Sequence, residues 1–271
     1  MREFFEALSY PFMYRAVIVG VLVSLCAALL GVVLVLKRYT LIGHGLGEVG
    51  FAATALAVAL GLSPMTVAVP LVVLASFLVM YLSQRGGASG DVAIGVMATS
   101  ALSVGVLITS LSRGSNVDVT SYMFGSILGL TNADMAVSAV LSAVVLVMYF
   151  LLFNRLFSIT YDEAFARATG INVTLYQFVI SFLTAVTVVL GMRMMGSMLI
   201  SSLIIFPALA ARRLTASFRG MVVAAAAISI AGFLVGMTLS FYLNLPTGAS
   251  VVCVDLAALG LALGVGRLRK G

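Results

Sequence analysis

The stretch Ala16 to Leu36 reads AVIVGVLVSLCAALLGVVLVL and is followed at once by the charged pair Lys37-Arg38. The stretch itself contains no charged side chain. A helix of about 20 apolar residues is long enough to cross the hydrocarbon core of a bilayer. The sequence therefore predicts a membrane-spanning helix that ends at a basic boundary.

The rest of the chain has the same character. Of its 271 residues, 62% are hydrophobic and 9% are charged, whereas a soluble domain is about 45–50% apolar and about 25% charged. Too few polar side chains exist to cover a water-facing surface. This excludes a soluble enzyme, a secreted disulfide scaffold and a disordered tail. At about 20 residues per span, the length accommodates about eight to ten spans in one membrane domain, residues 1–271.

Nine apolar segments divide this domain. They lie near 14–36, 42–61, 64–82, 91–112, 132–153, 173–192, 196–211, 220–243 and 248–266. The segment at 196–211 is short and ends at Pro207, so we expect it to be broken or re-entrant. A further stretch, Ser121 to Leu130, is apolar but too short to cross. We predict an all-α fold, a polytopic bundle of about eight to nine membrane segments.

The basic residues orient the bundle. If the segments alternate from an outer N-terminus, 11 of the 15 Lys and Arg residues lie on the inner side. The positive-inside rule therefore favours a cytoplasmic C-terminus and a cytoplasmic loop at 154–172. The net charge of +6 reflects this topology and does not indicate a nucleic-acid partner. We interpret the N-terminus as retained, because no small-residue cleavage site follows it.

The loop at 154–172 reads NRLFSITYDEAFARATGIN. Thr160 and Glu163 have the spacing of a capping box, Asp162 adds an acid in the first turn, and Gly170 suits the position after a helix end. The loop predicts a short capped helix with Tyr161 and Phe165 on one face. Two interpretations stay open: a surface helix on lipid headgroups, or a docking site for a cytoplasmic partner.

Two ionisable side chains begin the second apolar segment. His44, the one histidine of the chain, and Glu48 are four residues apart, so on a helix they share a face. Ionisable groups in lipid are costly and are functional candidates by default. An imidazole and a carboxylate suit Zn²⁺, Mn²⁺ or Fe²⁺, but two ligands need others from another helix or a second copy. The alternative is a hydrogen-bonded pair that only supports packing.

Asp255 is the other acid deep in an apolar segment. It is a candidate second-shell partner or proton carrier, and the alternative is a carboxyl group kept neutral by burial. Methionines cluster around 192–198 and are interpreted mainly as core filler. Cys26 and Cys253 lie in apolar runs and indicate neither a disulfide nor a metal knuckle.

Five motifs together resemble the membrane permease subunit of manganese, zinc and iron ABC-type importers. They are Lys37-Arg38 with Leu41-Ile42-Gly43 and the polar pair, Asp91-Val92-Ala93-Ile94-Gly95, Phe124-Gly125-Ser126-Ile127-Leu128, Glu163 to Gly170, and Gly196 to Ala208 with Pro246-Thr247-Gly248-Ala249. Their order and spacing are specific, although each alone is weak.

The resemblance implies a type II ABC importer-like fold in a plasma (bacterial inner) membrane. It implies a dimer of two copies, two cytoplasmic ATP-binding subunits, and an external protein that delivers the metal. It also implies that the helix at 154–172 couples to the ATPase, through Asp162, Glu163, Phe165, Ala166, Arg167, Ala168 and Gly170. No Gly-x-x-x-x-Gly-Lys motif occurs, so we expect hydrolysis in a separate chain. No permanently bound cofactor is expected; the metal is cargo.

One departure from the family pattern concerns the polar pair. The family places Asp first and His four residues later, whereas this chain has His44 first and Glu48 second. The inverted pair still supplies one imidazole and one carboxylate, four residues apart. Three other functions stay as alternatives: a gradient-driven transporter using Glu48 and Asp255, an intramembrane enzyme, and an ABC importer of a metal chelate. The loop at 154–172 argues against a gradient-driven transporter, which needs no such helix. The lack of a second histidine and of a nucleophile–base pair argues against an enzyme. The short length and the polar pair argue against a chelate importer.

Overall fold

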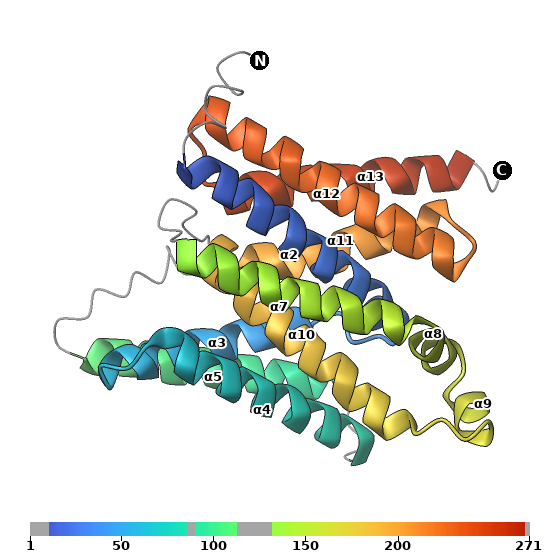
Figure 1. Ribbon diagram of the computed structural model, residues 1–271, viewed down its shortest axis with the longest axis horizontal. Coiled ribbons are helices and arrows are strands. Elements are labelled where there is room, and N and C mark those ends of the chain that lie inside the picture. Colours follow the sequence, from blue (N-terminus) through green and yellow to red (C-terminus); the bar gives the residue numbers. More distant parts are fainter. Residues whose placement is uncertain (1–10, 86–89, 113–131, 269–271) are drawn as a thin grey trace.

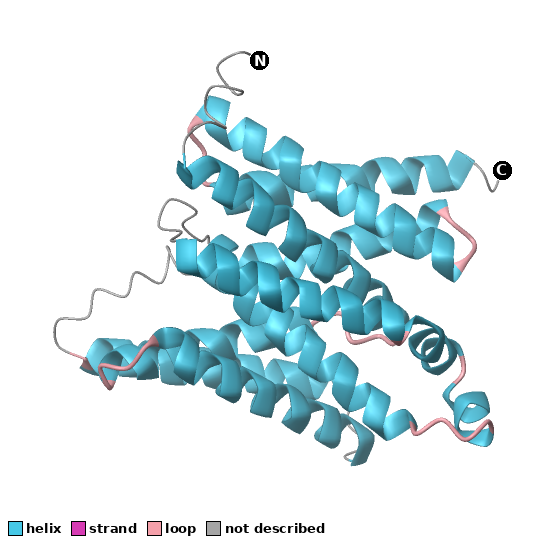
Figure 2. Cartoon of the chain, viewed as in Figure 1, coloured by secondary structure: helices cyan, strands magenta, loops and turns pink. Residues whose placement is uncertain are grey.

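The computed structural model describes residues 11–85, 90–112 and 132–268, and within them every regular element is a helix (Figure 2). The helices are α2 Pro11–Leu36, α3 Ile42–Ala59, α4 Pro64–Arg85, α5 Gly90–Leu111, α7 Asn132–Leu151, α8 Phe153–Tyr161, α9 Glu163–Ala168, α10 Val173–Met195, α11 Ser197–Leu214, α12 Phe218–Leu243 and α13 Thr247–Leu268. A helix satisfies its own backbone hydrogen bonds, which a chain surrounded by lipid requires. The predicted all-α fold is confirmed.

Eight of these helices are long and apolar enough to cross a membrane. A ninth span is formed if α7 and α8 are taken together, but their axes differ by 66° at the break between them. The count agrees with the predicted eight to nine segments. The bend turns α8 away from α7 at the end of the bundle where α9 follows (Figure 1).

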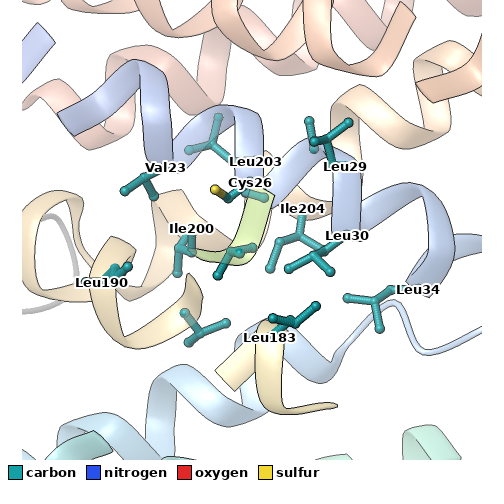
Figure 3. Packing of buried hydrophobic residues seen from close by; sticks show 14 of the residues in the cluster. Val23, Cys26, Leu29, Leu30, Leu34, Leu183, Leu190, Ile200, Leu203 and Ile204 are labelled. Atoms are coloured by element: carbon teal, nitrogen blue, oxygen red, sulfur yellow. The ribbon is translucent and has the colours of Figure 1, made fainter. Parts of the chain in front are cut away.

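Three helices form the centre of the bundle. Helices α2, α10 and α11 pack together, with α3, α4 and α5 on one side and α12 and α13 on the other (Figure 1). Leu30, Leu183 and Ile204 are each 1% exposed or less and meet where these three helices converge (Figure 3). Because lipid is as apolar as these side chains, the close fit between helices rather than hydrophobicity holds the bundle together.

Glycines allow two of the close approaches. A Cβ atom at Gly31 of α2 would overlap the backbone carbonyl of Ile204 in α11. A Cβ atom at Gly45 of α3 would lie 2.6 Å from Cγ2 of Ile94 in α5. Glycine is therefore required at both positions for the helices to reach their observed separation.

Two local predictions were wrong. The segment at 196–211 is not broken: α11 continues through the buried Pro207 to Leu214. Proline costs a helix one backbone hydrogen bond, but neighbouring helices hold the segment in place. The loop at 154–172 contains two helices, α8 and α9, instead of one short helix. The stretch Ser121 to Leu130, with its Phe124-Gly125 motif, lies outside the described residues.

Candidate functional site

The polar pair lies at the start of α3. The chain leaves α2 through a turn in which Arg38 has φ +63°, and α3 begins four residues later at Ile42. His44 is therefore in the first turn of α3, and Glu48 follows one turn on. His44 Nδ1 lies 3.8 Å from Glu48 Oε1, which is an ion-pair distance and longer than a hydrogen bond.

The two side chains differ in exposure. The His44 side chain is 48% exposed, whereas that of Glu48 is 6% exposed. The shared helix face thus buries the carboxylate and leaves the imidazole accessible. This arrangement leaves the His44 imidazole accessible to a ligand or a second chain, with the buried Glu48 carboxylate at ion-pair distance from it.

A cavity of about 430 Å³ opens beside His44, between α3, α11 and α13. Besides His44, its walls include Met198, Ser201 and Ser202 of α11 and Cys253 of α13. Met198 is 41% exposed and Cys253 is exposed. The cavity therefore presents imidazole, thioether and thiol groups, whereas the buried hydroxyls of Ser201 and Ser202 donate to backbone carbonyls of their own helix. The sulfur groups are donors that softer metal ions prefer.

The pair by itself is an incomplete metal site. Throughout the part of the chain that the structure covers, no cluster of three or more His, Cys, Asp or Glu side chains is placed to hold an ion. Zn²⁺ in proteins ordinarily takes four ligands, and its catalytic sites still take three. Additional ligands must come from the cavity, from solvent or from another chain.

Asp255 lies elsewhere, on α13 against α12. It is 1% exposed, and a Cβ atom at Gly232 of α12 would overlap its Oδ1 atom. Among the described residues, no group donates a hydrogen bond to either of its carboxylate oxygens. Asp255 does not line the cavity beside His44.

The helix predicted in the 154–172 loop corresponds to α9. Its N-cap is Asp162, whose Oδ1 accepts a hydrogen bond from the Phe165 backbone at 2.9 Å. Thr160, the predicted cap, instead lies in α8 and donates to the Leu156 carbonyl. The prediction failed because α8 extends the helix past Thr160, leaving Asp162 as the first extended residue. Gly170 has φ +81° and follows the end of α9, as predicted.

A small separate core holds α9 in place. Ala166 is fully buried with Ile159 of α8 and Val173 of α10. The opposite side is open: Phe165 is 62% exposed and Tyr161, at the end of α8, is 73% exposed. Such aromatic side chains on a rigid, exposed element are typical of protein contact sites.

Glu163 joins α9 to two other helices. Its Oε1 accepts a hydrogen bond from Lys37 Nζ at 2.5 Å and another from Gln177 Nε2 of α10 at 2.8 Å. Arg167 lies beside its other oxygen, with Nη2 3.9 Å from Oε2. Arg167 and Ala168 are otherwise exposed. The Glu163 side chain therefore points toward Lys37 and α10, whereas the side chains of Tyr161 and Phe165 are exposed.

Sequence reasoning missed four of these residues as site components. Lys37 entered as a boundary charge and as part of the first family motif, Met198 mainly as core filler, Cys253 as an unpaired thiol, and Gln177 not at all. Each reaches its partners from a different helix, and no local pattern in the sequence records such a contact. The charge of Lys37 next to a long apolar run was the one available signal for an internal ion pair.

Eight apolar helices of membrane-spanning length in the described part of the chain define a polytopic membrane protein. The model of the ABC 3 transport family matches residues 9–265, and the chain belongs to that family. The resemblance found in its motifs is thereby confirmed. Family membership makes it a multi-pass permease subunit, whose partners are an ATP-binding subunit and a substrate-binding protein.

Three similar proteins show the extent of the match. The chain is 30% identical over 254 residues to the high-affinity zinc uptake system membrane protein ZnuB of Haemophilus influenzae, covering 94% of this chain and 97% of that protein. It is 27% identical over 259 residues to the manganese transport system membrane protein MntC of Halalkalibacterium halodurans, covering 96% and 89%. The solved structure of PsaBC from Streptococcus pneumoniae in complex with Fab has the same fold, with a TM-score of 0.85 at 24% identity over 96% of this chain and 94% of that one.

Proposed function

We propose that this permease imports a divalent transition-metal ion, Zn²⁺, Mn²⁺ or Fe²⁺, and that His44 and Glu48 bind the ion as it passes. The observation that carries the proposal is the half-exposed imidazole of His44 on an accessible cavity, with the Glu48 carboxylate 3.8 Å behind it. The relatives named for zinc and manganese transport support it. The ion is cargo, and no resident cofactor is needed.

A second copy of the chain would complete the site. Two copies related by a two-fold axis bring together two imidazoles and two carboxylates, a set that suits all three ions. The His44 side chain is 48% exposed in the single chain, which leaves it accessible to such a copy. Binding must be weak enough to release the ion, because a site that holds its cargo tightly stops conduction.

Helix α9 would receive the ATP-binding subunits in the cytoplasm, where ATP is hydrolysed. The exposed Phe165 and Arg167 would form the contact, and the buried Ala166 would keep α9 rigid. A metal-binding protein would dock at the opposite end of the bundle, outside the plasma membrane. Asp162 would cap the start of α9, Gly170 would allow the turn after its end, and Ala168 would leave room for the partner.

Movement of α9 would reach the metal site through Glu163. This carboxylate binds Lys37, which directly follows α2, and the short turn after Lys37 leads into α3 and His44. A displacement of α9 would therefore pull on the start of the helix that carries the polar pair. The same pull acts on α10 through Gln177.

The test uses the permease reconstituted with its ATP-binding subunit and its substrate-binding protein. Uptake of radioactive Zn²⁺, Mn²⁺ and Fe²⁺ is measured for the wild type, for His44→Ala and for Glu48→Gln. Both variants are expected to lose uptake of the cargo ion at least tenfold while assembly is unchanged. A double variant, His44→Asp with Glu48→His, restores the family order of the ligands and is expected to recover uptake.

Two results would contradict the proposal. Unchanged uptake of all three ions in both single variants would reduce the pair to a packing element. Uptake that persists without the ATP-binding subunit, and that Asp255→Asn abolishes, would favour a gradient-driven transporter. We expect Asp255→Asn to retain uptake, because a neutral amide is cheaper to bury than a charge.

A further inference from the structure

A second hollow lies between α11 and α13 at the end of the bundle that carries α8 and α9. It encloses about 430 Å³ and is lined by Leu209, Arg212, Arg213, Leu259, Leu263 and Gly266. Its location at this end follows from Arg212, which also lines a neighbouring hollow together with Tyr161 of α8. By the predicted topology this is the cytoplasmic end. The hollow is separate from the cavity beside His44 and shares no residue with it.

The two arginines in this hollow carry uncompensated charge. Arg212 and Arg213 are exposed and occupy the last turn of α11. Among the residues whose placement is described, no carboxylate lies within ion-pair distance of either guanidinium group. Their charge partly offsets the negative end of the α11 dipole, but it leaves the guanidinium donors available to an anion.

The remaining walls of the hollow are apolar. Leu209 of α11 and Leu259 and Leu263 of α13 continue along the membrane-spanning part of the two helices. Gly266 adds no side chain, and a Cβ atom there would lie 3.5 Å from Cβ of Arg213. A ligand that fits all of these walls needs an anionic head beside the arginines and an apolar tail beside the leucines.

We propose that this hollow binds the phosphate headgroup of an anionic phospholipid from the cytoplasmic leaflet. Arg212 and Arg213 contact the phosphate, and the three leucines contact the first part of an acyl chain. Basic pockets between membrane helices on the cytoplasmic side have the chemistry to hold such headgroups. A docked protein would need the arginines but not a leucine-lined slot directed into the membrane.

The experiment measures lipid bound to the purified permease complexed with its ATP-binding subunit. The complex is exchanged into phosphatidylcholine nanodiscs with a small fraction of phosphatidylglycerol, and retained phosphatidylglycerol is counted by native mass spectrometry. The double variant Arg212→Gln, Arg213→Gln is expected to lower the affinity roughly 30-fold, from two basic side chains near an anionic headgroup. Gly266→Leu fills the hollow without changing any charge and is expected to lower retention as well.

The matched control is Arg219→Gln, which removes an exposed arginine from α12 at the same end, outside the hollow. Retention in this variant is expected to equal that of the wild type. Equal loss in Arg219→Gln would overturn the proposal, because any surface arginine would then suffice. So would retention that survives both the double variant and Gly266→Leu.

Two further arms identify the occupant. Inorganic phosphate, titrated against the same complex, is expected to displace phosphatidylglycerol only weakly; displacement as strong as by added phosphatidylglycerol would show that the hollow binds free phosphate. The ATP-binding subunit is expected to stay bound in the double variant in pure phosphatidylcholine. Its dissociation there would assign the arginines to a protein contact and refute the lipid site.

Discussion

Lys37 Nζ lies 2.5 Å from Glu163 Oε1, although 126 positions separate the two residues in the chain. The Lys37 side chain is 6% exposed and that of Glu163 is 41% exposed. Gln177 of α10 donates to the same oxygen. One carboxylate therefore joins the end of α2, the helix α9 and the start of α10, and a charge change at Glu163 is felt by all three.

Replacing Glu163 by Gln should weaken this junction. The variant leaves the nearly buried ammonium group of Lys37 without a charged partner, and a hydrogen bond to a charged group contributes about 1.5–3 kcal/mol. We expect thermal unfolding in detergent to occur at lower temperature and ATP hydrolysis to continue with less transport per ATP. The measurement compares ATPase and uptake rates on the same vesicles.

Arg167→Gln is the matched control for the stability measurement on that variant. Arg167 also lies beside Glu163, but its side chain is 64% exposed and its Nη2 atom is 3.9 Å away, and exposed pairs contribute about 0–1 kcal/mol. Stability should change little. If Arg167→Gln lowers stability as much as Glu163→Gln, the Lys37 contact is not what holds α9.

Phe165→Ala should weaken assembly with the ATP-binding subunit. Phe165 is 62% exposed on the outer face of α9, and a buried aromatic anchor at an interface costs about 2 kcal/mol or more when truncated, roughly a 30-fold loss of affinity. Affinity is measured by titrating the ATP-binding subunit onto the permease in nanodiscs. Phe150→Ala, at 60% exposure on α7 and away from α9 in the sequence, should leave that affinity unchanged; an equal loss would disprove a specific role for α9.

The two cysteines should react at very different rates. Cys253 is exposed on the cavity beside His44, whereas Cys26 is 1% exposed. In single-cysteine variants of the complex, N-ethylmaleimide should label Cys253 quickly and Cys26 hardly at all. Zn²⁺ should slow the labelling of Cys253 and Mg²⁺ should not, because sulfur ligands prefer the softer ion. Protection by Mg²⁺ to the same degree would show that the thiol senses charge alone.

Two glycine substitutions should have opposite effects on stability. Gly31→Ala forces Cβ against the Ile204 carbonyl, and overpacking of this kind costs about 1–3 kcal/mol. Gly260→Ala in α13 meets no atom within 4 Å and should stabilise its helix by up to about 1 kcal/mol. Unfolding temperatures of the two variants check this. A stabilised Gly31→Ala would mean that α2 and α11 can separate at little cost.

Residue spacing and hydropathy predicted the features that depend on neighbouring residues in the sequence, namely the helical spans and the shared face of the polar pair. The four-residue spacing of His44 and Glu48 required a shared helix face, and the spans followed from hydropathy alone. The path of α11 through Pro207 was not predictable, because packing by neighbouring helices outweighs the broken hydrogen bond. The N-cap is Asp162 and not the predicted Thr160, because buried Leu156 and Ile159 hold α8 in place as far as Tyr161. These are contacts with other helices, which the loop sequence does not reveal.

The single-residue junction at Gly196 has a consequence for communication between the two membrane surfaces. Gln177 at one end of α10 contacts Glu163, and at the other end only Gly196 separates α10 from Ser197 of α11, next to Met198 of the cavity. From Gln177 to Met195 the helix is about 27 Å long at about 1.5 Å per residue. Gly196, with φ +90°, is the single residue between α10 and α11, so a movement of the end of α10 also moves the start of α11. Where nucleotide binding inside changes the affinity for the protein that docks outside, thermodynamic linkage requires that protein to change the nucleotide affinity by the same factor.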